Sequence, residues 1–452
     1  MKRILSLFVL AGCVDDIPGQ PPPLDQVHYP VGLALVAGDA RLLVVNSNFD
    51  LRYGAGSLLS LPVEGSYALA KQSTVESPID RLPEDTYGVR IPSFGGEVAV
   101  IPGPSGAVTA AVPSRGKNLV TFVDVGRDGG LSCSTAGADA LAGIDCSAAH
   151  VIETRGIDPY AVSLVAGTRA LAVGHLRADV GHPALSLFDL DVLASRKAAE
   201  AAGQALPSAA LTSTTSDLAG VAGLVSFGQA EGELVMAAAR FSGGVPVTTY
   251  RVSASDEGLA MAPVARLSLG SLTGATELRG LALSADRTRA YVAMRVLESS
   301  GGAGPTLFNS AIAVIRIDGA ALSLASVIEV GDEIGAPALL ERGEQRFVYA
   351  PDLRTGSIYV LDARSDALLV ASVIRGYRTR PGDGELLHVG WLSTPAAIVF
   401  ASLPSENKTL AFVSNFANST LAVIDASSED PREHVLVGRL GRVMMPDGST
   451  DE

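Results

Sequence analysis

Residues 279–293 read RGLALSADRTRAYVA, and residues 312–318 follow as IAVIRID. The stretch holds a Gly-apolar-Ala-apolar run, a polar turn at 284–286, a second apolar run, and a third that closes on Asp318. A fourth apolar run, LSLASVIEV, spans 322–330. Short runs rich in aliphatic and β-branched residues, separated by turn residues, are typical of β-strands. The stretch therefore predicts four consecutive strands of one antiparallel sheet.

The same phrase recurs along the chain. Its seven copies start at or near Pro30, Gly96, Gly156, Gly220, Arg279, Gly335 and Thr394. The spacing of about 60 residues, with four strands in each unit, is typical of propeller blades. One blade cannot bury both of its faces alone, so the units must pack into a ring. We predict an all-β fold, a seven-bladed β-propeller of four-stranded antiparallel blades over residues 30–441. Two stacked β-sandwich domains are the alternative, which does not explain seven units in uniform order.

Two of these units resemble a known repeat family. The segments GLALSADRTRAYVA (280–293) and TLAFVSNFANSTLAVID (409–425) are similar to the YVTN-type β-propeller repeat. That family combines a Gly-Val/Ile-Ala strand, a Ser-Pro-Asp-Gly turn, a Tyr-Val-x-Asn strand and a Val-Ile-Asp strand. Here Ala285 stands where the family has proline. The resemblance implies the propeller fold, but the family includes binding proteins and unrelated enzymes, so it implies no particular activity.

The way in which the ring closes is open at this stage. The run VLVGRL (435–440) can complete the seventh blade alone, or the segment before Pro30 can contribute a strand. A polar tail, residues 442–452, follows the last unit.

Composition excludes several classes of partner. The chain of 452 residues is 47% hydrophobic and carries a formal net charge of −14. Because no basic stripe offsets this charge, we expect neither nucleic acid nor an anionic membrane surface as a general partner. No run of about 20 apolar residues occurs beyond the first residues, so we expect no membrane-spanning helix.

The first residues, MKRILSLFVLAGC, resemble a bacterial lipoprotein signal. Lys2 and Arg3 precede a short apolar stretch, and residues 10–13 (LAGC) match the lipobox in which the cysteine is lipidated. The resemblance implies a signal peptide over 1–12, a lipidated Cys13 and a Pro-rich tether over 13–29. An ordinary apolar start with a chance cysteine is the alternative. We expect a protein of the bacterial cell envelope, anchored by lipid at the outer membrane, facing the periplasm or the exterior, and touching the membrane through this anchor only.

Two further cysteines remain. In an oxidising compartment, Cys133 and Cys146 form an even pair, and we predict a disulfide between them. Two buried free thiols are the alternative.

Long loops gather on one side of the predicted ring. Loops from the second to the third strand of a blade, and from the fourth strand to the next blade, open on one face, which we call the top face. We assign to it the long segments 46–56, 77–94, 173–183, 294–310 and 375–392. Elaborate loops on a rigid scaffold mark the more probable binding surface.

Polar residues directly follow the second strand of each unit, next to the predicted channel mouth. They are Asn48, Arg115, His175, Arg240, Arg295, Asp352 and Asn415, and Arg354 adds to the same rim. Because guanidinium groups suit oxyanions, we interpret this set as an anion-accepting funnel for a carboxylate, a phosphate, a sulfated sugar or an acidic peptide. The alternative is that these arginines pair with neighbouring carboxylates or lie in water.

Metal and catalytic sites have weaker support. His175, Asp179 and His182 share one loop, but loop histidines at irregular spacing seldom hold a metal. Motifs for a nucleophile elbow, a zinc-binding helix or a phosphate loop are absent from the sequence. We therefore predict no catalytic residue, no metal and no cofactor.

Two function classes follow. The first is a non-enzymatic, lipid-anchored binding or interaction scaffold, a monomeric ring whose partner is an envelope protein or a small anionic ligand. The second is a propeller hydrolase or lactonase-like enzyme with its site at the channel mouth. It stays open because propeller active sites draw single residues from several blades and leave no local motif.

Overall fold

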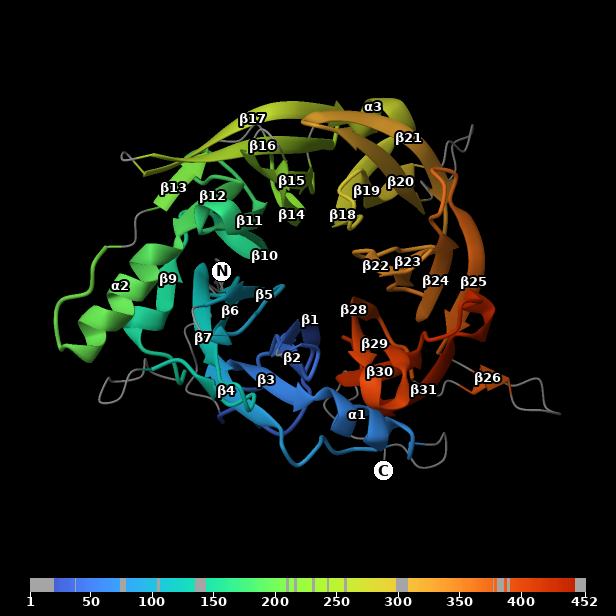
Figure 1. Ribbon diagram of the computed structural model, residues 1–452, viewed down its shortest axis with the longest axis horizontal. Coiled ribbons are helices and arrows are strands. Elements are labelled where there is room, and N and C mark those ends of the chain that lie inside the picture. Colours follow the sequence, from blue (N-terminus) through green and yellow to red (C-terminus); the bar gives the residue numbers. More distant parts are fainter. Residues whose placement is uncertain are drawn as a thin grey trace, which may run out of the picture.

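The computed structural model describes residues 20–36, 38–73, 79–103, 106–134, 144–208, 211–214, 218–229, 232–241, 244–255, 258–297, 308–376, 378–379, 386–387 and 391–443. Within them, seven small antiparallel sheets stand in a ring around a central space (Figure 1). Each sheet is a blade of four positions, whose first strand lies innermost and whose last lies at the rim. The predicted seven-bladed β-propeller is thus confirmed.

The strands follow one another through the blades in chain order. Blade 1 contains β1 (Pro30–Val36), β2 (Arg41–Asn46), β3 (Gly56–Pro62) and β4 (Tyr87–Ile91). Blade 2 contains β5 (Ala99–Pro102), β6 (Val108–Ser114), β7 (Leu119–Val125), β8 (Leu131–Ser132) and β9 (Val151–Glu153). Blade 3 contains β10 (Ile157–Val165), β11 (Ala170–Arg177), β12 (Leu185–Asp189) and β13 (Leu211–Thr214). Blades 4 and 5 contain β14 (Val221–Gln229), β15 (Gly232–Ala239), β16 (Pro246–Ser255) and β17 (Gly258–Ser268); and β18 (Ala275–Leu283), β19 (Arg289–Leu297), β20 (Phe308–Asp318) and β21 (Ala321–Glu329). Blades 6 and 7 contain β22 (Ala338–Arg342), β23 (Gln345–Asp352), β24 (Ser357–Asp362) and β25 (Leu369–Arg375); and β28 (Pro395–Leu403), β29 (Lys408–Asn415), β30 (Thr420–Asp425) and β31 (Val435–Leu440). A hairpin of β26 (Arg378–Thr379) and β27 (Leu386–Leu387) stands apart from the blades.

Blade 7 consists of the last four strands of the chain, so β31 completes it without a strand from the N-terminal segment. That segment instead fills the seam between blades 7 and 1. Val27 is 1% exposed and packs in the same apolar cluster as Leu440. Leu24 lies against Gly88 of β4. The described part of the predicted tether is therefore held on the ring.

The apolar core is divided among the seams between blades. Within the described residues, seven clusters of buried side chains each join two neighbouring blades. In β2, Leu42 and Val44 face blade 7, whereas Leu43 and Val45 face blade 2. Because side chains alternate along a strand, a strand between two blades is buried on both faces. This double burial explains why the second and third strands read as continuous apolar runs.

The repeated glycine of the innermost strands has a packing reason. A Cβ on Gly32 would lie 2.5 Å from the carbonyl oxygen of Gly96 in the next blade. A Cβ on Gly280 would lie 2.5 Å from the Cβ of Ala336 in blade 6. First strands converge toward the ring axis, so only residues without side chains fit where their backbones come closest.

The rim of blade 2 is split into two pieces. Both β8 and β9 pair with β7, at its opposite ends. Cys133 and Cys146 form a disulfide at the base of the excursion between these pieces. The predicted disulfide is confirmed, and residues 135–143 of the excursion lie outside the described residues.

Three α-helices occur in the described residues: α1 (Val63–Ala70), α2 (Leu190–Ala201) and α3 (Leu269–Thr273). Helix α2 lies at the ring's edge, and Asp189 caps it by accepting a hydrogen bond from the amide of Asp191. In the residues described, no helix has both the length and the apolar character needed to cross a membrane.

One loop assignment was wrong. We expected residues 77–94 on the top face, but residues 79–86 belong to the connection from β3 to β4, and 87–91 form β4 itself. Only residues 92–94, which follow β4, lie in a top-face connection. Connections from the third to the fourth strand open on the opposite side of the ring, which we call the bottom face.

Candidate functional site

A cavity of about 340 Å³ lies where the innermost strands begin, at the top mouth of the central channel. Six of the seven blades contribute to its wall. The lining residues are Arg115, Tyr160, Leu176, Ala222, Arg240, Glu277, Leu278, Arg279, Glu333, Gly335, Ala336, Leu353 and Ala396. The cavity is therefore made by the ring as a whole and by no single loop.

A charged cluster from blades 5 and 6 forms one side of this mouth. Glu277 and Arg279 are two residues apart in β18, where the pairing with β19 is irregular between Leu278 and Gly280, and their side chains contact each other. Arg279 Nη2 donates to Glu277 Oε2 at 3.2 Å, and its Nη1 donates to Glu333 Oε1 at 2.8 Å. Arg279 is 13% exposed. These bonds fix the two carboxylates in place.

The three predicted arginines reach the same region with looser contacts. Arg240 Nε lies 3.7 Å from Glu277 Oε1, and Arg295 Nη1 lies 3.6 Å from Glu277 Oε2. Arg115, on blade 2, places its Nε 3.8 Å from Asp158 Oδ1, and this Nε has no hydrogen-bond partner among the described residues. Each of the three side chains is about a third exposed. Arg115 and Arg240 thus line the mouth, whereas Arg295 does not line the cavity and lies beside Glu277 and Glu333.

Asp352 is buried, and its carboxylate bonds with loop backbone and does not line the channel cavity. Its carboxylate accepts hydrogen bonds from the backbone amides of Asp332 (2.9 Å), Glu333 (3.3 Å), Arg354 (3.0 Å) and Thr355 (3.2 Å). It therefore positions the loop that carries Glu333 at the mouth. The side chain of Arg354 is exposed, and Arg354 does not line the cavity.

Two predicted asparagines are also buried in loops. Asn48 Nδ2 donates to the carbonyl of Tyr53 at 2.7 Å and to Ser93 Oγ at 2.9 Å. Asn415 Nδ2 donates to the carbonyl of Trp391 at 2.8 Å. Both are at most 1% exposed. The structure does not bring them together with the arginines.

His175 is fully buried beneath Gly156, and its Nε2 lies 3.0 Å from Ser186 Oγ. Burial lowers its pKa to about 4, so it is neutral at physiological pH. His182 pairs instead with Asp179, at 2.5 Å between Nδ1 and Oδ1. The described residues contain no cluster of three or more ligand-type side chains that could hold a metal.

Glu97 was not predicted. It lies just before β5, and its Oε2 accepts a hydrogen bond from the amide of Val162 in β10, at 3.3 Å. Enclosure by the inner strands raises the pKa of its carboxyl to about 7. Burial, with a smaller contribution from the nearby charge of Glu97, raises the pKa of the Tyr160 phenol to about 12.

Replacing Glu97 with glutamine should change how stability depends on pH. The folded-state pKa of Glu97 lies above its ordinary value of 4.5, so its contribution is present at low pH and is lost as pH rises toward 7. Glutamine cannot ionise and keeps an acceptor for Val162. Relative to the wild type, E97Q should gain about 2 kcal/mol of unfolding free energy between pH 5.5 and pH 8.5. Urea denaturation at both pH values measures this, and parallel pH profiles of the two proteins would contradict it.

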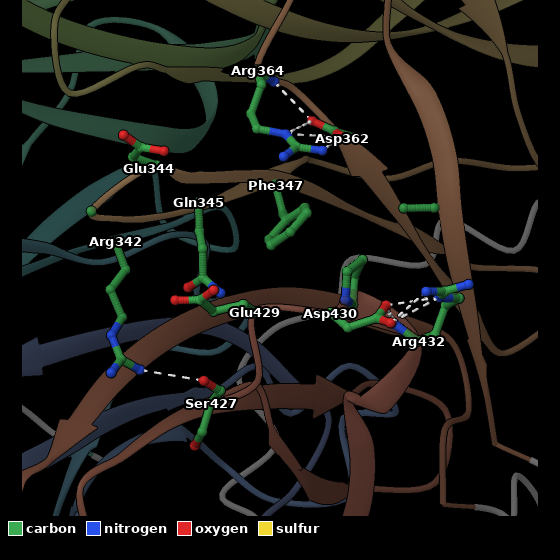
Figure 2. A pocket seen from close by; sticks show the side chains of 13 residues that line it. Arg342, Glu344, Gln345, Phe347, Asp362, Arg364, Ser427, Glu429, Asp430 and Arg432 are labelled. Carbon is green, nitrogen blue, oxygen red and sulfur yellow. Dashed lines mark hydrogen bonds and ion pairs between the residues drawn. The ribbon is translucent and has the colours of Figure 1, made fainter.

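A larger hollow lies between blades 6 and 7 on the bottom face, with a volume of about 760 Å³. Figure 2 shows that Arg364 and Arg432 face Asp362 and Asp430, whereas Arg342 faces Ser427 across the hollow. Arg364 pairs with Asp362, and Arg432 Nε donates to Asp430 Oδ1 at 2.8 Å. These pairs are local, between residues two positions apart, and they occupy the guanidinium groups. We therefore place the candidate site at the channel mouth.

Sequence reasoning missed Tyr160, Glu277, Arg279 and Glu333, which line the mouth, and Glu97, which lies near Tyr160. One signal was available: the segment TELRGLAL (276–283) carries two charged residues in a strand that the ring should bury. Charges at the start of an innermost strand must face the channel, because the seams are apolar.

Comparison with protein-family models and with curated proteins found no match. Among solved structures, the chain is similar to Kuenenia stuttgartiensis hydrazine synthase, with 11% identity, a TM-score of 0.54, and coverage of 89% of this chain and 96% of that chain. Sqt1 from Chaetomium thermophilum matches with 13% identity and a TM-score of 0.48, over 91% of this chain and 84% of that chain. A protein from Desulfotomaculum acetoxidans matches with 12% identity and a TM-score of 0.46, over 84% and 95%. Such low identities show the propeller fold alone, and the YVTN resemblance stays a prediction.

Proposed function

We propose that this protein is a non-enzymatic binding protein of the bacterial cell envelope, anchored by lipid at Cys13, whose channel mouth receives an anionic group of its ligand. One observation carries the binding part: Arg115 and Arg240, from blades 2 and 4, line a single cavity of about 340 Å³. Their contacts with carboxylates, 3.7–3.8 Å, are longer than hydrogen bonds. A carboxylate or phosphate oxygen can therefore offer them closer, charge-assisted bonds.

The carboxylates at the mouth restrict which chemical groups the ligand can carry. Glu277 and Glu333 are held by Arg279 and leave the cavity with charges of both signs. A simple polyanion meets repulsion there, whereas a ligand that carries one anionic group beside hydrogen-bond donors satisfies both sides. We therefore propose a small ligand with one carboxylate or phosphate and further hydroxyl or amino groups.

Removing two arginines tests this proposal. In R115Q/R240Q, the loss of two charge-assisted hydrogen bonds should weaken binding about 10- to 100-fold. Isothermal titration with gluconate and with glycerol 3-phosphate, one probe for each anion type, gives the affinities. The matched control is R364Q/R432Q, which removes two arginines that face their own aspartates on the bottom face. Equal affinity in the two double variants would contradict an anion-binding mouth.

A second candidate, a lactonase-like hydrolase, has one observation in its favour. A carboxyl with a pKa of about 7, as burial gives Glu97, can act as a general acid or base near neutral pH. The variant E97Q separates the two candidates. If the protein only binds, E97Q should bind the same probes with unchanged affinity; if it hydrolyses lactones, E97Q should lose turnover of gluconolactone while R364Q/R432Q keeps it.

A further inference from the structure

The described chain joins the ring on the top face. The amide of Gly54, in the loop between β2 and β3, donates to the carbonyl of Gln20 at 3.2 Å. Gln20 lies seven positions after Cys13, and a chain of that length reaches at most about 25 Å. A lipid on Cys13 would therefore hold the top face, and not the bottom face, next to the membrane.

The exposed apolar side chains of the connections between strands also lie on the top face. Among the described residues, the large exposed apolar side chains of the loops all lie on the top face: Phe49, Leu51, Val180, Phe241 and Leu272. The remaining ones are on outermost strands at the rim, and the described turns of the bottom face carry none. Apolar side chains gathered at loop tips on one face are typical of a surface that contacts a partner or a membrane.

The exposed Phe49 packs against other aromatic rings. It is 51% exposed, and its ring centroid lies 5.2 Å from that of Phe416 and 6.1 Å from those of Tyr29 and Phe94. Tyr29 and Phe94 both have positive φ values, 48° and 58°, which non-glycine residues rarely adopt. The loops thus hold this aromatic group in place, so that Phe49 can project from the face without an ordering cost on contact.

The charge of this face suits anionic headgroups. Its loops and strand ends expose Lys117, Arg155, Arg177, Arg354, Arg375 and Arg442. The exposed carboxylates there include Asp50, Glu153, Asp179, Glu329 and Asp332. Asp50 lies beside His28 and Arg52, and Asp179 pairs with His182. Basic residues that surround apolar loop tips attract a protein to an anionic bilayer and let the tips enter its headgroup region.

We propose that the top face docks on the anionic phospholipid surface of the membrane that carries the anchor, with the channel mouth directed toward the lipid headgroups. This proposal replaces the expectation that only the anchor touches the membrane, because exposed basic and apolar side chains lie together on the top face. The orientation rests on the proposed lipidation of Cys13. It means that a ligand reaches the mouth from the membrane side, through the gap between the ring and the bilayer.

Energy transfer in vesicles tests the orientation. Acylated protein is reconstituted into vesicles of phosphatidylethanolamine and phosphatidylglycerol with an acceptor dye on a fraction of the headgroups. A donor dye is attached at V180C on the top face or at E344C in the bottom-face turn between β22 and β23. A strand of nine residues such as β18 spans about 30 Å, so the two labels differ clearly in distance from the bilayer. We expect strong transfer from V180C and weak transfer from E344C.

A matched pair of triple variants tests the contact itself. In F49S/L51S/F241S the loss of top-face apolar side chains should reduce transfer from V180C, whereas L369S/V370S/V435S, which removes exposed apolar side chains from outermost strands, should leave it unchanged. Equal transfer from the two labels, or equal effects of the two triple variants, would overturn the docking proposal while the anchor stands. Mass spectrometry of the protein purified from cells decides the anchor separately: if Cys13 carries no acyl chain, the anchor and the orientation that rests on it are both wrong.

Discussion

The variant G280A is expected to unfold with a free energy lower than the wild type by about 3–5 kcal/mol, because its methyl group would overlap the backbone of the next blade. The Cβ position on Gly280 lies 2.5 Å from the Cβ of Ala336 and 2.7 Å from its Cα. Backbone atoms cannot turn away as a flexible side chain can, so blades 5 and 6 must separate at their inner edge. The φ angle of Gly280, 153°, adds strain for any residue with a side chain.

The control for this prediction is G319A. Gly319 also has a positive φ, 57°, but a Cβ there meets no atom within 4 Å. It carries the backbone strain alone, and we expect a loss of about 1 kcal/mol. Urea denaturation of both variants measures the difference. If the two alanines cost the same, then the close approach of the inner strands is not what requires glycine in the repeat.

The variant D352A is expected to lose about 3–5 kcal/mol of unfolding free energy. Asp352 is buried, and its two oxygens accept hydrogen bonds from four backbone amides of two top-face loops. Alanine leaves these donors without an acceptor. Asparagine keeps Oδ1, which serves Glu333, Arg354 and Thr355, but places an amide against the donor of Asp332. D352N should therefore lie between alanine and the wild type.

Urea denaturation of D352A, D352N and D318A measures these changes in unfolding free energy. Asp318 ends β20 as Asp352 ends β23, but it is exposed, and its replacement should change stability by no more than about 0.5 kcal/mol. A loss in D352A as small as that in D318A would show that the four amides find other acceptors. It would also return Asp352 to the set of candidate ligand-binding residues.

The seven-fold repeat was predictable because local sequence patterns specify the strands of each unit. The apolar run within RLLVVN of β2 indicates burial on both faces of the strand. The Gly-apolar-Ala pattern indicates the close approach of inner strands. The pairing of Cys133 with Cys146 followed from the even count of the remaining cysteines. Alanine, lysine and glutamate favour helix α2 at the ring's edge, and its capping residue Asp189 lies directly before it.

The channel mouth was only partly predictable. A polar residue after the second strand of a blade can point to the channel or turn into its own loop, and sequence position does not distinguish these cases. Arg115 and Arg240 are long enough to reach the mouth, whereas Asn48 and Asn415 bond with nearby loop backbone. Short amides and carboxylates at strand ends compete well for local backbone groups.

By itself, the sequence determined the number of blades, the first three strands of each blade and the disulfide, because these depend on local patterns repeated at a fixed spacing. The tertiary structure alone decided which side chains meet at the channel mouth. Arg115, Glu277 and Glu333 come from blades 2, 5 and 6 and converge only when the ring closes. It also decided that Val27 seals the seam between the first and last blades and that the chain joins the ring on the top face. Convergence of distant residues depends on the curvature of the whole ring, which no single repeat encodes.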